Sequence, residues 1–140
     1  MEYNFETSCS KTKLADIRSF VRSVLKEHQI ADVDINSMVL AVEEVVANLI
    51  IHSHNCNPRE IIKLNILIEK NQGITFKIID KGVGFNISEY KEPSINEIIR
   101  QKKKGGIGLI LVKRIMDDVE YINNSSHNVY RLYKKMQSPI

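Results

Sequence analysis

The chain opens with two different periodicities of apolar residues. Residues 2–8 alternate apolar and polar side chains, which predicts a strand with one buried face. Ser10 can cap a helix that follows, because its hydroxyl can accept a hydrogen bond from the first helical turn. The apolar side chains of this predicted helix form a single stripe: Leu14, Ile17, Val21, Val24 and Leu25.

A second helix is predicted from about Asp34 to about His52, with a broad apolar face, and Pro58 lies in the break that ends it. Two strand-like runs follow, at residues 61–69 and 74–79. The four residues between these runs are Lys70-Asn71-Gln72-Gly73, a typical hairpin turn.

Residues 81–106 are rich in turn-forming residues and too long for an ordinary connection, so we expect a binding loop or lid there. A helix at 107–116 and strands at 119–122 and 129–133 complete the chain. The order β-α-α-β-β-loop-α-β-β predicts an α+β fold, a two-layer sandwich with a mainly antiparallel sheet and helices on one face. We expect residues 1–140 to form a single domain.

Composition excludes several classes of function. The net charge of +3 is mild, and no clustered basic helix indicates direct binding of nucleic acid. No apolar run approaches the ~20 residues that cross a bilayer, and the first residues do not resemble a secretion signal. The two cysteines have no metal-binding or redox spacing, so we expect a reducing, cytoplasmic location. The pairs Asp117-Asp118 and Lys134-Lys135 are interpreted as a solvated turn and an exposed strand end.

Three polar or glycine-rich segments could carry chemistry. On the second predicted helix, Glu44, Asn48 and His52 recur at steps of four and so share one stripe. A carboxylate and a carboxamide in line can provide a general base and an oxygen ligand for Mg²⁺. A simple solvated helix face would give the same spacing.

The other two segments follow a strand and precede a helix. Asp80 ends a strand and is followed by Gly82 and Gly84, so its carboxylate could accept a hydrogen bond from an exocyclic amine while the glycines admit a flat ring. Alone, this segment could equally be a turn. The run Lys102-Lys103-Lys104-Gly105-Gly106-Ile107-Gly108 opens a helix, where free N–H groups can bind an anion, although a flexible loop is the alternative.

Taken together and in this order, the three segments resemble the N, G1 and G2 boxes of GHKL ATPases, and the flanking residues look like the RsbW-type serine-kinase anti-sigma factors of bacteria. This resemblance covers essentially the whole chain. It implies a Bergerat-type pocket for ATP and Mg²⁺. The family often has alanine after the asparagine of the N box and an alanine or glycine followed by tyrosine after its histidine, where this chain has Leu49 and Ser53-His54.

The resemblance also assigns roles by position. Glu44 matches the general base, Asn48 the magnesium ligand, and Asp80 the adenine-binding aspartate with Gly82 and Gly84 beside it. The phosphate-binding positions correspond to Gly105, Gly106 and Gly108, and Lys104 stands where a basic residue could touch the γ-phosphate.

The function implied by the resemblance is an anti-sigma factor that phosphorylates a serine of an anti-anti-sigma antagonist and sequesters a sigma factor. Homodimerisation is expected by analogy alone. Two alternatives remain open: an ATP-dependent binding regulator with negligible turnover, and a histidine-kinase-like ATPase domain. Glu44 disfavours both, because a pure binder needs no base and histidine kinases usually carry asparagine at that position.

Overall fold

The computed structural model describes residues 1–50, 59–81, 107–124 and 127–136. The elements follow in the predicted order, and their bounds differ only slightly from those expected. They are β1 (Glu2–Ser8), a 3-10 turn (Lys11–Lys13), α1 (Leu14–Glu27), α2 (Asp32–Asn48), β2 (Ile61–Glu69), β3 (Gly73–Asp80), α4 (Ile107–Ile115), β4 (Asp118–Asn123) and β5 (Asn128–Lys135). The predicted loop or lid and the predicted end of the second helix at His52 lie outside the described residues.

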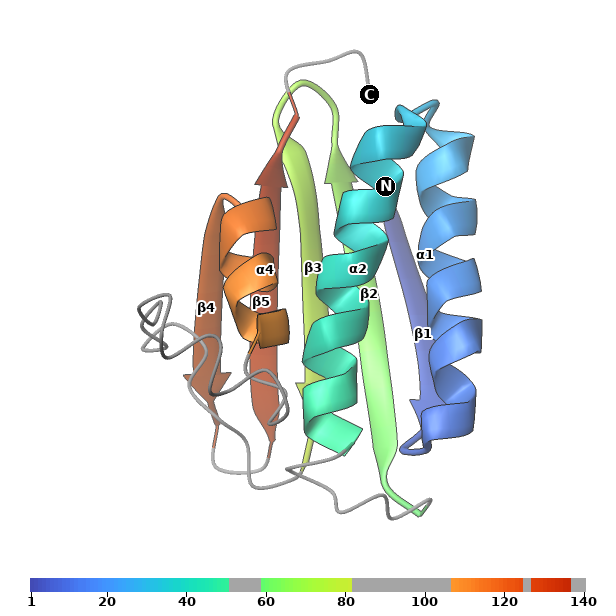
Figure 1. Cartoon of the computed structure of the whole chain (residues 1–140), viewed down its shortest axis with the longest axis vertical. Coiled ribbons are helices and arrows are strands. Elements are labelled where there is room, and N and C mark those ends of the chain that lie inside the picture. Colours follow the sequence, from blue (N-terminus) through green and yellow to red (C-terminus); the bar gives the residue numbers. More distant parts are fainter. Residues whose placement is uncertain (51–58, 82–106, 125–126, 137–140) are drawn as a thin grey trace.

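The five strands form one sheet in the order β1-β2-β3-β5-β4, and each neighbouring pair is antiparallel (Figure 1). β5 is therefore inserted between β3 and β4, while β1 and β4 are the edges. In this register Lys63 lies opposite Ile79, and Asp80 lies opposite Asn128. The sheet brings the last residue of β3 next to the first residue of β5.

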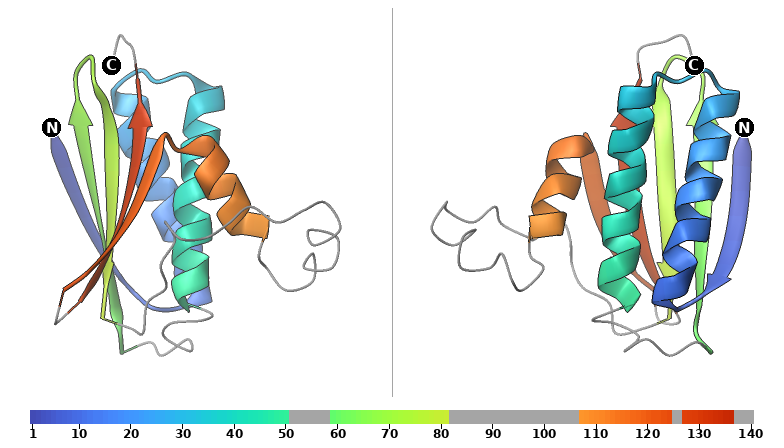
Figure 2. Two further views of the ribbon diagram at one scale, coloured as in Figure 1. Left: turned by 90° about the vertical axis from the view of Figure 1, so that its left-hand side faces the viewer. Right: turned by 45° about the vertical axis from the view of Figure 1, so that its right-hand side comes forward.

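The helices α1, α2 and α4 lie on one face of the sheet, and α2 stands between the other two (Figure 2). The α+β two-layer sandwich is thereby confirmed. The core between the layers is mostly aliphatic, and its largest fully buried side chains are the aromatic Tyr130 and Phe76. Among the described residues no helix is long and apolar enough to span a membrane.

Local sequence accounts for where several elements begin and end. Ser10 caps the 3-10 turn that leads into α1 and not α1 itself: its Oγ accepts a hydrogen bond from the Thr12 amide, whereas Lys13, which precedes α1, makes no side-chain cap bond. Gln29, just after α1, and Asn71, in the β2–β3 turn, have positive φ angles of 57° and 64°. Asparagine tolerates this left-handed conformation well, which suits it to a hairpin turn.

Gly73 begins β3 where the chain approaches β5 closely. A Cβ atom at this position would lie 2.5 Å from the Lys134 carbonyl oxygen and 2.7 Å from the Tyr133 hydroxyl. The carbonyl belongs to the backbone of a paired strand and cannot swing away. The position therefore requires glycine.

We predict that Gly73→Ala lowers the free energy of unfolding by about 1–3 kcal/mol, the usual cost of overpacking a close contact. Urea unfolding followed by circular dichroism would measure this change. Lys77→Ala, an exposed position on the same strand, is the matched control and should change stability by less than about 0.5 kcal/mol. Equal stabilities of the glycine and alanine proteins would contradict the close contact.

Candidate functional site

The elements that carry the three candidate segments end or begin in the lower half of Figure 1. α2 and β3 run in the same direction and both end at the bottom of Figure 1, and α4 begins beside the lower half of α2. Glu44 and Asn48 lie in the last turns of α2, Asp80 is the last residue of β3, and Gly108 is the second residue of α4. The fold thus gathers residues that are separated by up to 64 positions in the sequence.

The contact that joins α2 to α4 at this end is between Glu44 and Gly108. A Cβ atom on residue 108 would overlap Glu44 Oε2 and would lie 2.8 Å from Glu44 Cδ. The carboxylate therefore lies directly against the backbone of the first turn of α4. Glycine lets the carboxylate lie here undisturbed, whereas a larger residue would have to displace it, so a carboxylate of α2 is in contact with a glycine of α4.

Glu44 is half-buried, and its pKa is raised above the usual value. Burial, which disfavours the charged carboxylate, is the larger cause, and the negative charge of neighbouring Glu43 adds to it. A carboxylate in this setting holds a proton more firmly than one in water. This is the direction expected of a group that accepts a proton during a reaction.

Glu43, next in sequence to Glu44, has a different environment. Its Oε1 accepts a hydrogen bond of 2.6 Å from Arg18 Nη1 on α1, in a half-exposed ion pair. Arg18 thereby partly neutralises Glu43 and attaches α2 to α1. Sequence analysis had not singled out either residue, because nothing in the local pattern pairs an arginine with a glutamate 25 positions away.

Asn48 is held by its own helix. Its Nδ2 donates a 2.8 Å hydrogen bond to the Glu44 carbonyl oxygen one turn earlier. This bond distinguishes the amide nitrogen from the oxygen, because only the nitrogen can donate. The oxygen is the atom that a hard cation such as Mg²⁺ would use, and this hydrogen bond does not engage it.

Asp80 is 1% exposed and ends β3 on the helix-covered face, in alternation with buried Ile78 and Phe76. An aspartate is rarely this buried without a polar role. Next to it in the sheet, Asn128 is also buried and accepts a 2.7 Å hydrogen bond from the Tyr121 hydroxyl. The end of β3 thus places a carboxylate and a carboxamide side by side at the base of the helical layer.

The remaining candidate residues are Gly82, Gly84, Lys104, Gly105 and Gly106. They lie outside the described residues, so their assigned roles stay predictions. What the described residues provide is a carboxylate base candidate, an oriented amide, a buried aspartate and the start of a helix.

A cavity of about 470 Å³ also borders the end of β3. Its described lining comes from β1, β2, β3 and the ends of neighbouring turns: Glu6, Arg59, Glu60, Ile61, Lys63, Ile79, Asp80, Lys81 and His127. Glu44, Asn48 and Gly108 are not among these described lining residues. The lining contains equal numbers of arginine or lysine cations and carboxylates, which favours no particular class of ligand. We therefore do not assign the cavity to the site that contains Glu44, Asn48 and Gly108.

Comparison with known proteins identifies the family. Residues 7–134 match the model of the histidine kinase-like ATPase domain. The chain belongs to this family. Membership of an ATPase family implies nucleotide binding, and the resemblance to GHKL proteins that the three motifs indicated is confirmed.

Among individual members and neighbours of this family, the anti-sigma F factor of Bacillus cytotoxicus is 31% identical over 94 residues, which is 66% of this chain and 63% of that protein. The match therefore spans less than two thirds of that relative. The RsbU and RsbW domains of a Mycobacterium tuberculosis protein share the fold with a TM-score of 0.68 and 13% identity, over 99% of this chain and 33% of that chain. A chain of the SiaB–SiaC complex of Pseudomonas aeruginosa shares the fold with a TM-score of 0.63 and 11% identity, over 96% of this chain and 89% of that chain.

The contact between Gly108 and Glu44 can be tested by a double-mutant cycle. Replacing a helical glycine by alanine usually stabilises a protein by up to about 1 kcal/mol. We predict no such gain for Gly108→Ala in the wild type, because the new methyl group must displace the Glu44 carboxylate. In a Glu44→Ala background the gain should appear, giving a coupling energy of about 1 kcal/mol in urea unfolding. Additive effects would show that the two residues do not touch.

The raised pKa of Glu44 predicts a pH dependence of stability. A carboxyl whose pKa is higher in the folded protein than in the unfolded chain binds its proton more tightly when folded. Stability therefore falls as pH rises from the pKa of Glu44 in the unfolded chain through its higher pKa in the folded protein, and it remains lower above that pH. Glu44→Gln removes the titrating group, so its stability relative to the wild type should be greater at pH 7 than at pH 4. Parallel pH profiles of the two proteins would contradict the raised pKa.

Proposed function

We propose that this protein binds ATP with Mg²⁺ and phosphorylates a serine of an antagonist protein, acting as an anti-sigma factor of the partner-switching type. The observation that carries the proposal is the contact between Glu44 and Gly108, which puts a carboxylate of raised pKa beside the first turn of a helix. Similarity to anti-sigma F factors supports the regulatory part of the proposal.

The described residues fit a nucleotide with its metal ion. The first turn of α4 lies against the Glu44 carboxylate, which a side chain at residue 108 would displace, and the N–H groups of a helical first turn favour anions. The orientation of Asn48 suits a cation ligand. Buried Asp80, at the end of β3, has the chemistry to accept a hydrogen bond from an amino group of adenine.

Each of these residues has a distinct part in the proposed reaction. Bound ATP supplies the phosphoryl group and Mg²⁺ neutralises part of its charge. Glu44 accepts the proton of the serine hydroxyl as the oxygen forms its bond to phosphorus and ADP leaves. Its partial burial and the neighbouring Glu43 carboxylate raise its proton affinity. Asn48 orients the metal ion and Asp80 orients the adenine ring, and neither residue reacts.

Binding and chemistry can be separated with two isosteric variants. Asp80→Asn should weaken MgATP binding about tenfold or more, because an anionic acceptor of a hydrogen bond is lost. Glu44→Gln should bind MgATP nearly as well as the wild type and transfer phosphate about 10²–10⁴-fold more slowly, because an amide cannot accept the proton. Isothermal titration with MgATP and transfer of radiolabelled phosphate to the cognate serine-bearing antagonist are the measurements.

Each outcome of this experiment decides one part of the proposal. Wild-type transfer rates in Glu44→Gln would exclude Glu44 as the base. Unchanged affinity in Asp80→Asn would remove the adenine assignment. A wild type that binds MgATP tightly but never phosphorylates its genuine antagonist would be an ATP-dependent binding regulator instead of a kinase.

A further inference from the structure

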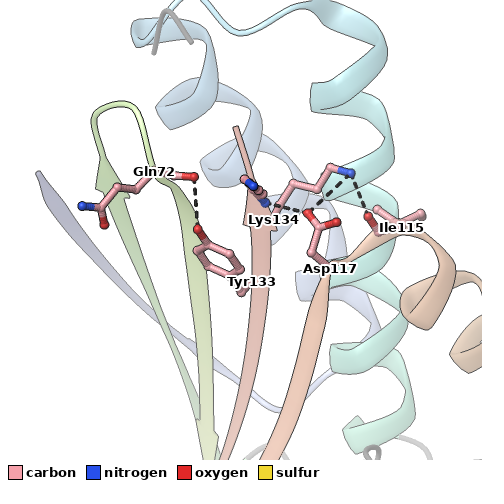
Figure 3. A network of polar contacts seen from close by, with 6 residues as sticks. Gln72, Ile115, Asp117, Tyr133 and Lys134 are labelled. Atoms are coloured by element: carbon pink, nitrogen blue, oxygen red, sulfur yellow. Dashed lines mark hydrogen bonds and ion pairs between the residues drawn. The ribbon is translucent and has the colours of Figure 1, made fainter. Parts of the chain in front are cut away.

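The helix that meets Glu44 at its start is tied to the sheet at its end. Lys134, on β5, reaches the C-terminal end of α4, where its Nζ donates a 3.0 Å hydrogen bond to the Ile115 carbonyl oxygen (Figure 3). The same ammonium group lies 4.0 Å from Asp117 Oδ2. Lys134 is therefore not the simply exposed strand end that the sequence suggested.

This contact satisfies a specific physical need of α4. The last carbonyl groups of a helix have no partner within the helix and carry the negative end of its dipole, so a cation stabilises them. The Lys134 side chain is 27% exposed, and the interaction is screened less than one in open water. Lys113 and Arg114, in the last turn of α4 itself, are exposed and belong to the helix rather than to the sheet.

Asp117 completes the attachment and is likewise more than a solvated turn residue. Its backbone N–H donates to the Tyr133 carbonyl at 2.8 Å, and its Oδ2 accepts a 2.6 Å hydrogen bond from the Lys135 amide. β5 is in turn tied to the β2–β3 turn, because the Tyr133 hydroxyl donates to the Gln72 carbonyl at 3.1 Å (Figure 3). The end of α4 is thus attached to a firmly paired part of the sheet.

α4 has only nine residues, so the position of one end constrains the other. Ile115 lies seven positions after Gly108, about 10 Å along a helix at 1.5 Å per residue. Over so short a distance a helix behaves as a rigid rod. A small tilt or slide at Ile115 would be carried to Gly108, where the backbone already lies against the Glu44 carboxylate.

We propose that Lys134 is a positioning residue for the nucleotide site: by holding the Ile115 carbonyl, it keeps α4 where Gly108 meets Glu44. This inference rests on the proposed nucleotide binding and adds a residue on β5, remote from the site in sequence, that sets its geometry. Lys134 does not itself contact the reacting atoms. Its effect is transmitted through α4.

The test compares three variants in two measurements. Lys134→Met retains the length of the side chain without the charge or the donor, and Lys134→Arg retains both. Lys135→Ala removes the neighbouring, exposed side chain and leaves the backbone hydrogen bond from residue 135 to Asp117 in place. We expect Lys134→Met to weaken MgATP binding about fivefold in isothermal titration, a usual size for coupling through a packed element. Lys134→Arg should restore the affinity to within about twofold, and Lys135→Ala should leave it unchanged.

The second measurement needs no nucleotide. The ¹⁵N–¹H resonance of Gly108 should shift in Lys134→Met and return towards the wild-type position in Lys134→Arg. A Met variant with a lowered melting temperature, wild-type MgATP affinity and an unmoved Gly108 resonance would show that Lys134 only stabilises the fold, which overturns the inference. Should Lys134→Met fail to fold, Lys134→Gln, which retains a donor without the charge, takes its place under the same criteria.

The two measurements also distinguish this inference from the proposed function. Failure of the wild type to bind MgATP would overturn the nucleotide assignment, and with it any role of Lys134 in nucleotide affinity. The Gly108 resonance would then still decide whether Lys134 positions α4. Normal wild-type binding with no effect of Lys134→Met on either readout would overturn the role of Lys134 and leave the proposed function standing.

Discussion

Burial of the apolar face of α2 is the interaction on which the rest of the structure depends. Seven of its residues are buried: Ile35, Met38, Val39, Ala41, Val42, Val45 and Val46. Each such side chain contributes about 1–3 kcal/mol when removed from water. Because these positions set the rotation of the helix about its axis, they also determine where its polar stripe points. Glu44 and Asn48 reach the end of the sheet by this means, and α1 and α4 pack on either side.

Adjacent carboxylates on this helix have different environments because their neighbours differ. Glu43 points towards α1 and is paired with Arg18, whereas Glu44 lies against the backbone of α4. An ion pair at a half-exposed position contributes little to stability. Its greater effect is to keep Glu43 partly neutralised, so that the proton affinity of Glu44 is raised mainly by its own burial. One helix turn thereby provides both an anchor and a candidate base.

The short helix α4 connects the candidate site with the far part of the sheet. One of its ends is constrained by the missing side chain of Gly108 and the other by the Lys134 ammonium group. Solved structures with only 11% and 13% identity share this fold over nearly the whole chain. Such likeness is possible because the fold requires a pattern of buried positions and not particular residues at them. The site makes narrower demands, since a residue larger than glycine at position 108 would displace the Glu44 carboxylate.

The sequence by itself determined the elements, their order and the class of fold, because periods of 2 and 3.6 are local properties that a single chain displays directly. It also indicated the three motifs and the ATPase family, since these are read from short segments. The resemblance implied one pocket formed by these motifs. The tertiary structure places Gly108 against Glu44, with Asn48 and Asp80 at the ends of α2 and β3 that lie on the same side of the molecule. The roles of Gly82, Gly84, Lys104, Gly105 and Gly106 stay predictions.

Only the tertiary structure decided the insertion of β5 between β3 and β4 and the close approach of Gly108 to the Glu44 carboxylate. The same holds for the ion pair of Arg18 with Glu43 and the attachment of Lys134 to Ile115. Each joins residues from different elements, and local periodicity carries no information about which distant partner an element will meet. Asp117 and Lys134 illustrate the reason. Each is a charged residue of the kind that usually lies in solvent, and their partners become apparent only when α4 and β5 are packed together.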